Sequence, residues 1–381
     1  MNEPQLPIAD LSADLSNDDL RFMAAAIRYA RRHKGLTGTN PSVGTLIVRD
    51  GIIVGRGVTA IGGRPHAEPQ ALAEAGEAAG GATAYVTLEP CAHHGRTPPC
   101  AEALVRAGVA RVVVAATDPD ERVSGKGFAI LREAGIEVVP GVLAREAAND
   151  LAGYLNRSSR KRPEVILKLA LSADGMIGQS GKGQVAITGP VSRAQSHILR
   201  AQSDVILIGI GTALADDPQL NCRLPGLESR APVRVVLDSS LRLPLTAQLV
   251  KTADAQPLWL ACGEDASDER RYELKAAGCR ILAAETHEGR IALPELMDDL
   301  AALGIGSVLV EGGAAVAQNF LQEKLVDRLI VFQSAVEIGT GQEGQQGVVV
   351  TGLETHMTEE FEIFRQAQYG DDAYREYVRK T

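Results

Sequence analysis

The chain has 381 residues, a length that favours two hydrophobic cores over one. Its composition is 45% hydrophobic and 23% charged, as in ordinary soluble globular proteins, and its formal net charge of −9 argues against a nucleic-acid partner. No apolar run approaches the roughly 20 residues that cross a bilayer, so no membrane partner is expected either.

Residues 1–17 are polar and acidic, and they lack the charged-then-apolar layout of a signal peptide. We interpret them as a loose leader and expect the protein in the cytoplasm, a reducing compartment. Five cysteines do not form a disulfide framework in a chain of this size and setting. Cys91 and Cys100 are therefore expected to be thiolates on a metal ion rather than a cystine.

Strand and helix patterns alternate through residues 18–155, which predicts a layered α/β domain with a largely parallel sheet. Asn17 is the candidate N-cap of the first helix, because acidic residues follow it and basic residues end the pattern. Asp50-Gly51 is a dipeptide typical of a tight hairpin. The predicted helices cover 18–34, 66–79, 98–108 and 125–135, and the predicted strands cover 43–50, 52–58, 82–90, 110–119 and 136–141.

The pattern breaks at residues 156–163, which are polar and basic and which we predict to be a linker. A second alternation follows in residues 164–381 and predicts a second α/β domain. Its predicted helices cover 192–202, 269–278, 293–304 and 314–324, and its predicted strands cover 165–175, 203–212, 233–240, 257–262, 307–313, 328–338 and 361–370.

Three metal-ligating side chains and one carboxylate fall within 35 residues of the first domain: His66, Glu68, Cys91 and Cys100. A structural zinc site takes four protein ligands, whereas a hydrolytic site takes three and leaves a position for a water molecule of lowered pKa. Glu68 is too close to His66 along the chain to be a comfortable fourth ligand, and a carboxylate is less expected beside two thiolates. We therefore place His66, Cys91 and Cys100 on zinc and Glu68 beside the water as the general base.

Other zinc sites fit this spacing less well. Zinc fingers use short paired clamps, whereas eight residues separate Cys91 from Cys100. H-x-E followed later by P-C is typical of zinc nucleobase deaminases, although there the second cysteine comes after two residues. A catalytic zinc is favoured and a structural staple stays open. His93 and His94 are interpreted as loop residues that face substrate, the alternative being an exposed polar pair.

The segments 39–44 (TNPSVG), 66–68 (HAE) and 89–100 (EPCAHHGRTPPC) resemble the deaminase half of the bifunctional riboflavin-biosynthesis deaminase–reductases, which have this long cysteine spacing. The resemblance implies a cytidine-deaminase-like three-layer domain. It also implies loss of an exocyclic amine, as ammonia, from 2,5-diamino-6-ribosylamino-4(3H)-pyrimidinone 5′-phosphate, with Glu68 moving the protons. Asn40 matches a substrate-contacting position; its alternative is a turn residue before Pro41.

Glycines in the second domain give a weak signal by themselves. The run 209–214 (GIGTAL) lacks the third glycine of a dinucleotide fingerprint, and the glycines after Glu311 stand where a helix start can cradle phosphate. On pattern alone, nucleotide binding and simple tight turns both stay open.

The segments 168–175, 199–220, 236–240 and 310–313 resemble the reductase half of the same family. The resemblance implies a dihydrofolate-reductase-like fold in which NADPH delivers hydride to C1′ and opens the ribosyl ring to a ribityl chain. Lys168 and Asp216 are candidates to assist proton transfer. The positions that match NADPH contacts are Ala170, Ala186, Thr212, Asp216, Ser239, Gly313, Ala314, Ala315, Val316, Ala317, Gln318 and Asn319. Those that match substrate contacts are Arg200, Leu220, Arg223 and Glu311, and the two arginines suit a 5′-phosphate.

Two stretches depart from the family pattern. Family members commonly read S-x-W-I-T where this chain has residues 184–188 (QVAIT), so Ala186 gives a smaller wall near the nicotinamide. The Gly/Gln-rich segment 338–350 matches weakly and receives no function.

Three rival hypotheses remain. A deaminase acting on another nucleotide or on RNA bases would need a basic groove and stacking aromatics, against the acidic charge and 4% aromatic content. A zinc-stapled scaffold would carry a non-catalytic nucleotide-binding second domain. In a third, only one half is active. The resemblance further implies a homo-oligomer, at least a dimer.

Overall fold

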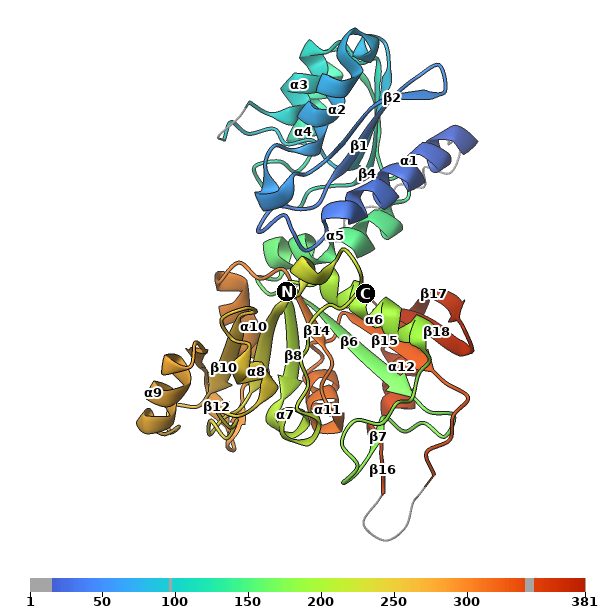
Figure 1. The fold of residues 1–381 in the computed structure, drawn as a ribbon. Helices are drawn as coiled ribbons and strands as arrows, with labels where there is room; N and C mark the ends of the chain where they lie inside the picture. Colours follow the sequence, from blue (N-terminus) through green and yellow to red (C-terminus); the bar gives the residue numbers. More distant parts are fainter. Residues whose placement is uncertain (1–15, 96–97, 340–345, 381) are drawn as a thin grey trace. The chain divides into compact units, whose positions relative to one another are not determined.

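The computed structural model describes residues 16–95, 98–339 and 346–380, and the chain forms two compact units, Met1–Arg160 and Lys161–Thr381 (Figure 1). Residues 1–15 of the predicted leader lie outside the described ranges. The last helix of the first unit, α5 (Ala144–Ser159), continues into the predicted linker 156–163, so the chain is still helical where we expected the linker to begin. None of the helices in the described ranges has the length and apolar content that a membrane span requires.

The first unit contains a five-stranded sheet in the order β2-β1-β3-β4-β5. The prediction of a largely parallel sheet is wrong here, because β1 runs antiparallel to both β2 and β3, and only the β3–β4 and β4–β5 pairs are parallel. The turn at Asp50-Gly51 has positive φ at both residues, which is the geometry that returns a strand antiparallel to itself. The strands are β1 (Gly44–Arg49), β2 (Ile52–Val58), β3 (Thr83–Leu88), β4 (Arg111–Ala116) and β5 (Glu137–Val139).

Helices cover both faces of this sheet and complete three layers. α1 and α5 pack on one face, and α2, α3 and α4 pack on the other (Figure 1). The first helix is capped by Ser16 rather than by Asn17: the Ser16 hydroxyl accepts from the Asp19 N–H, and the Asp19 carboxylate accepts from the Ser16 N–H. The helices are α1 (Asn17–Ala30), α2 (Ala67–Ala75), α3 (Cys100–Arg106), α4 (Lys126–Glu133) and α5.

The second unit contains a nine-stranded sheet in the order β11-β10-β9-β8-β14-β6-β15-β18-β17. The strands from β11 to β15 are parallel, and the hairpin of β17 and β18 continues the sheet antiparallel. The nine strands are β6 (Glu164–Leu171), β8 (Val205–Gly209), β9 (Val233–Leu237), β10 (Leu258–Cys262), β11 (Arg280–Ala283), β14 (Ser307–Val310), β15 (Arg328–Gln333), β17 (Phe361–Tyr369) and β18 (Asp372–Arg379). Two short pairs lie outside it: β7 (Gly178–Gln179) with β16 (Gly347–Val348), and β12 (Thr286–His287) with β13 (Arg290–Ile291).

Helices again cover the sheet on both sides. The predicted strand 203–212 is too long, because β8 ends at Gly209 and α7 begins at the next residue. Apolar residues of α10 and α11 pack on one face in one large cluster, and Leu199 of α6 joins Ile166 and Leu309 on the other. The helices are α6 (Pro190–Ala201), α7 (Ile210–Asp216), α8 (Gln248–Lys251), α9 (Asp268–Ala276), α10 (Leu293–Ala302), α11 (Ala314–Gln322) and α12 (Leu353–Glu359).

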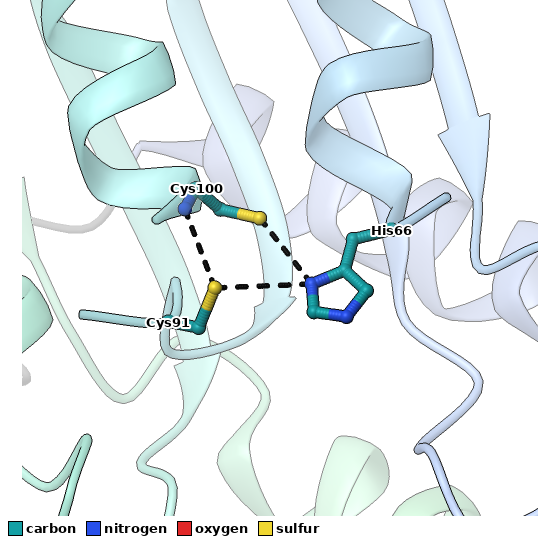
Figure 2. Close-up of side chains that lie close together, drawn as sticks. All are labelled: His66, Cys91 and Cys100. Carbon is teal, nitrogen blue, oxygen red and sulfur yellow. Dashed lines mark hydrogen bonds between the residues drawn. The ribbon is translucent and has the colours of Figure 1, made fainter. Parts of the chain in front are cut away.

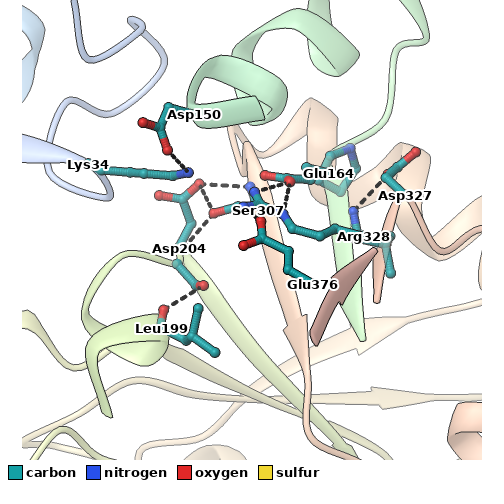
Figure 3. Close-up of polar contacts among 12 residues, drawn as sticks. Lys34, Asp150, Glu164, Leu199, Asp204, Ser307, Asp327, Arg328 and Glu376 are labelled. Atoms are coloured by element: carbon teal, nitrogen blue, oxygen red, sulfur yellow. Dashed lines mark hydrogen bonds and ion pairs between the residues drawn. The ribbon is translucent and has the colours of Figure 1, made fainter. Parts of the chain in front are cut away.

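A buried ionic cluster joins three strands of this sheet. Arg328 on β15 pairs with Glu164 on β6 and with Glu376 on β18, and all three residues are almost inaccessible to solvent (Figure 3). The Arg328 Nη1 to Glu376 Oε1 distance is 3.2 Å. The two carboxylates share one guanidinium. The burial of each charge on β6 and β18 is therefore compensated by Arg328 on the strand between them.

Candidate active sites

The three predicted zinc ligands lie together at one end of the first sheet. His66 is the N-cap of α2, Cys91 follows the end of β3, and Cys100 is the first residue of α3. The His66 Nδ1 atom lies 3.8 Å from Cys91 Sγ and 3.4 Å from Cys100 Sγ (Figure 2). Tetrahedral zinc, with bonds of about 2.1 Å to nitrogen and about 2.3 Å to sulfur, separates such atoms by roughly 3.6 Å. The donor set therefore fits one zinc ion.

The protein already favours a thiolate at this position. Cys91 Sγ accepts a hydrogen bond from the Cys100 backbone N–H at 3.3 Å. The Cys100 thiol, His66 and that N–H together lower the pKa of Cys91 to about 4, against the opposing effect of burial. The same interaction raises the pKa of Cys100, which acts as the donor of the pair. A cation that replaces the shared proton would hold both sulfurs as thiolates.

Glu68 lies in the first turn of α2, two residues after His66, and its side chain is 4% exposed. Burial and the negative charge of Cys91 raise the pKa of its carboxyl to about 7. A carboxyl with a pKa near the working pH can both accept and return a proton. This is the property that the predicted general base requires.

Two glycines of β2 fix the position of α2. A Cβ on Gly55 would lie 2.1 Å from the Ala71 carbonyl oxygen, and one on Gly57 would lie 2.0 Å from that of Ala67. Only glycine allows this close approach of helix to strand. The Gln70 amide then donates to the carbonyl oxygens of Val58 and His66, so the turn that carries both His66 and Glu68 is fixed at two points.

Glu89 holds the cysteine loop from the other side, a role that our sequence analysis missed. Its carboxylate is 3% exposed and accepts the backbone N–H groups of Gly125 and Gly127 at 3.2 and 3.1 Å. Gly127 lies so close that a Cβ there would be 2.2 Å from the Pro90 carbonyl oxygen. The available signal was the E-P-C motif itself, in which Glu89 is only two residues from the ligand Cys91.

The other predicted residues of this site stay predictions. The backbone carbonyl oxygen of Asn40 accepts from the Thr37 hydroxyl, and the side-chain amide of Asn40 lies against Gly63. His94 is exposed and lies 3.6 Å from Glu102, whereas the Nδ1 atom of His93 is shielded and has no hydrogen-bond partner among the described residues. Arg96 and Thr97 of the motif lie outside the described ranges.

The second unit contains a cavity of about 1010 Å³ between the ends of β6, β8 and β14 and the segment 177–188. Most residues predicted to contact NADPH or substrate line it: Lys168, Ala170, Ala186, Arg200, Thr212, Asp216, Arg223, Glu311, Gly313, Ala314, Ala315 and Val316. Other predicted positions are not among its lining residues: Ser239, Leu220, Ala317, Gln318 and Asn319. Of these, Leu220 and Ala317 have buried side chains.

An ionic group lies on the wall of this cavity. Arg200 holds Glu311 in a two-point pair, with Nε–Oε1 and Nη2–Oε2 distances of 2.9 Å. Burial alone would raise the pKa of Glu311, but the charges of Arg200 and Lys168 outweigh it and lower that pKa to about 2. Burial lowers the pKa of Lys168 despite the nearby Glu311. A lysine with a lowered pKa beside a fixed carboxylate is suited to proton transfer.

Thr212 connects two helices at the cavity, and Asp216 lies on the same wall. Thr212 Oγ1 accepts the Gly313 N–H at 3.0 Å, which joins α7 to the start of α11. Burial raises the pKa of Asp216, one turn further along α7. The glycine-containing turns that gave only a weak signal in the sequence therefore meet at one wall.

Two features of this site were not predicted from the sequence. Arg234 is completely buried and donates to the oxygens of Gln219, Thr252 and Gln256. Gln256 in turn donates to the Leu220 carbonyl oxygen, so these residues hold the loop that ends at Arg223. His197 also lines the cavity. Single polar residues outside a motif left no recognisable signal for either.

Comparisons with known proteins agree in both halves. The family model "cytidine and deoxycytidylate deaminase zinc-binding region" matches residues 16–116, and the model "RibD C-terminal domain" matches residues 163–361. The riboflavin biosynthesis protein RibD of Escherichia coli is 41% identical over 339 residues, which cover 86% of this chain and 90% of its own length. That of Aquifex aeolicus is 40% identical over 323 residues, covering 85% and 88%.

Solved structures give the same result over nearly the whole chain. RibD of Acinetobacter baumannii has a TM-score of 0.80 at 37% identity and covers 96% of this chain and 99% of its own. A diaminohydroxyphosphoribosylaminopyrimidine deaminase/5-amino-6-(5-phosphoribosylamino)uracil reductase from Thermotoga maritima has a TM-score of 0.80 at 31% identity, covering 95% and 99%.

The predicted resemblance, the fold class and the cofactors are confirmed by these matches. The range matched by the zinc-binding model includes His66, Glu68, Cys91 and Cys100. The range matched by the reductase model includes all the cavity residues discussed above. A deaminase with a non-catalytic second domain is not favoured. The chain belongs to the RibD family, bifunctional enzymes of riboflavin biosynthesis that combine a zinc-dependent deaminase with an NADPH-dependent reductase.

Proposed function

We propose that this chain deaminates 2,5-diamino-6-ribosylamino-4(3H)-pyrimidinone 5′-phosphate in its first unit and reduces the ribosyl group of the product in its second. The observation that carries the proposal is the meeting of three zinc-ligating atoms, all within 4.8 Å of one another, beside the buried carboxyl of Glu68. Family membership supports the substrate, and the donor set supports the hydrolytic chemistry.

In the first unit, His66, Cys91 and Cys100 hold the metal, which supplies an activated water when bound. Glu68 would accept one proton of that water and pass it to the ring nitrogen as the hydroxyl group adds to the ring carbon, and would then pass the proton of that hydroxyl to the leaving amine, which departs as ammonia. The raised pKa of Glu68 supports this double role, because burial makes its carboxylate a stronger proton acceptor than an exposed one. Asn40 orients the pyrimidine by hydrogen bonding.

In the second unit, the cavity holds NADPH and the deaminated substrate side by side. Ala170, Thr212 and the start of α11 contact NADPH, while Arg200, Arg223 and Glu311 contact the substrate. Lys168 and Asp216 provide and accept protons as hydride reaches C1′ and the ring opens. The cavity volume of about 1010 Å³ is sufficient for two ligands of this size.

The first test replaces Glu68 by Gln and follows ammonia release and NADPH oxidation in one assay. Glu68→Gln is expected to lower ammonia release about 10²- to 10⁴-fold, because proton transfer is lost while shape is kept. Zinc content, measured by atomic absorption, should stay at one per chain. NADPH oxidation with previously deaminated substrate should equal that of the wild type, which controls for folding.

Two outcomes would contradict the proposal. Undiminished ammonia release by Glu68→Gln would remove this residue from the chemistry. A zinc-loaded wild type that releases no ammonia would make the site a structural staple.

We also propose that the protein assembles as at least a dimer, acts in the cytoplasm and binds no nucleic acid. Family resemblance supports the first point, and the net charge of −9 supports the last. Light scattering of the purified protein checks the assembly: a molar mass near 40.3 kDa would mean a monomer and contradict it.

A further inference from the structure

One face of α6 carries three basic side chains toward the reductase cavity. Arg193, His197 and Arg200 are spaced by four and three residues, so they share one face of the helix. All three line the cavity. Leu199, on another face, packs against the buried cluster that contains Ile166 of β6 and Leu309 of β14, which holds the helix on the sheet.

The cavity as a whole is cationic, although the chain is acidic. Its lining contains four permanently or ordinarily charged cations, Lys168, Arg193, Arg200 and Arg223, and two carboxylates, Asp216 and Glu311. Glu311 already neutralises Arg200 through their two-point pair. Arg223 acts on the His197 ring through its positive charge, and Arg193 lies one helical turn before His197, so this part of the wall favours an anionic group.

The His197 ring has unused hydrogen-bonding capacity. Its Nδ1 atom is shielded from solvent and makes no hydrogen bond of normal geometry within the described part of the chain. The Asn221 backbone acts on the ring, but its carbonyl oxygen already accepts from Arg200 Nη1 at 3.0 Å. Burial and the positive charges of Arg200 and Arg223 lower the pKa of His197, and the Asn221 backbone and Glu311 oppose them only in part.

We propose that His197 is a further ligand of the substrate 5′-phosphate, which it binds together with Arg223 and Arg200; this inference rests on the proposed reductase function. A phosphate monoester dianion supplies acceptor oxygens for the ring N–H and offsets the positive charge around it. The binding step makes and breaks no covalent bond. Its effect is on substrate affinity, because the phosphate is remote from C1′.

The decisive experiment is a double-mutant-type cycle, in which the His197 side chain and the substrate 5′-phosphate are removed separately and together. The deaminated substrate is prepared with and without its 5′-phosphate, and KM and kcat for each are measured by NADPH oxidation with wild type and His197→Ala. His197→Ala should raise KM about tenfold for the phosphorylated substrate, the factor of one charge-assisted hydrogen bond. For the dephosphorylated substrate KM should be equal in both proteins, and kcat should change less than about twofold in each case.

Two further variants separate binding from structure. His197→Gln keeps a hydrogen-bond donor and should recover most of the affinity at pH 8. His287→Ala, at an exposed histidine of β12, is the matched control and should leave every constant unchanged. NADPH-binding constants and thermal unfolding midpoints should be equal in all four proteins.

The pH dependence gives a readout that a packing role would not move. Bound phosphate raises the pKa of His197, so its extra attraction is full below the pKa of the free ring and is lost as pH rises through that of the bound ring. The groups that act on the ring are Arg200, Arg223, Glu311 and the Asn221 backbone. The KM ratio of His197→Gln to wild type should therefore be largest at the acidic end of the measured range and fall toward one as pH rises.

Some results would overturn the assignment. An equal loss with both substrates would show that His197 only supports the wall. A raised KM for NADPH but not for the ribosyl phosphate would place the cofactor 2′-phosphate at this position instead. A wild type that does not oxidise NADPH with either substrate would refute the reductase function itself. That result differs from one in which the substrates react but the effect of His197→Ala is the same with and without the phosphate.

Discussion

At the scale of single residues, the cluster of Arg328, Glu164 and Glu376 shows that charged side chains can be buried when each is paired with an opposite charge. Both carboxylates face one guanidinium, and the Tyr374 hydroxyl donates to the second oxygen of Glu376 at 2.9 Å. A buried ion pair contributes little over apolar residues of the same volume, but removing one partner leaves an uncompensated charge. The cluster is therefore sensitive to single replacements and tolerant of complete ones.

Replacing Arg328 by Met should destabilise the second unit by about 3–5 kcal/mol, because the cation that compensates two buried carboxylates is then lost. Urea unfolding followed by the fluorescence of Trp259, the chain's one tryptophan, measures the loss. The combined variant Glu164→Leu, Arg328→Met and Glu376→Leu is the control and should recover most of the stability. A combined variant as unstable as Arg328→Met alone would show that the charges stabilise the sheet themselves.

At the scale of elements, the approach of α4 to the cysteine loop determines the zinc site from a distance. Gly127 in the first turn of α4 lies against the Pro90 carbonyl, and Glu89 accepts two N–H groups of the same turn. The loop and the helix are therefore one packed unit. A change on the helix must be transmitted to Cys91.

Gly127→Ala is expected to weaken zinc binding at least tenfold, since its Cβ would lie 2.2 Å from the Pro90 oxygen and the backbone there must move. Competition with a chromogenic chelator measures the affinity. Gly80→Ala is the control, because its Cβ would meet only the Glu77 oxygen at an ordinary 3.5 Å. Equal zinc affinity in both variants would show that the ligands are held independently of α4.

The sequence allowed prediction of most helices and strands, and the elements it missed have physical reasons. Strand β18 was missed because its alternation contains the charged Glu376 at a buried position, where the partner Arg328 makes it acceptable. Helix α5 was missed because only Ala147 and Leu151 are fully buried along its sixteen residues. Both depend on partners that the local pattern does not contain.

The two sites differed in how far the sequence allowed their residues to be predicted. The zinc site was predictable because its ligands lie in short motifs that each begin a helix or end a strand. The reductase cavity was less so, because its wall combines residues from 168 to 348 and includes single side chains such as His197. In the sequence Gly55 and Gly57 do not differ from other strand glycines. The structure shows that their lack of a Cβ allows α2 to pack closely on β2.

At the scale of the whole molecule, each unit has a hydrophobic core of its own. One buried cluster lies wholly within the first unit, and three lie wholly within the second. Calorimetry of the intact protein should show two unfolding transitions. Zinc removal should lower only the transition of the first unit, and NADPH should raise only that of the second, because a ligand stabilises the unit that binds it. A single transition shifted by both treatments would show that the units unfold together.

The order of strands in the second sheet has a consequence for protein synthesis. Lys168 on β6 meets Glu311 only after β14 has inserted between β8 and β6, and β15 must then take the other side of β6. On the ribosome, all of the first unit is synthesised before Lys161 is added, whereas the reductase wall needs residues that are translated much later. A nascent chain can therefore fold its deaminase while its reductase is still unmade. Translation that stops early in the second unit would leave a protein that performs the first reaction and accumulates its product.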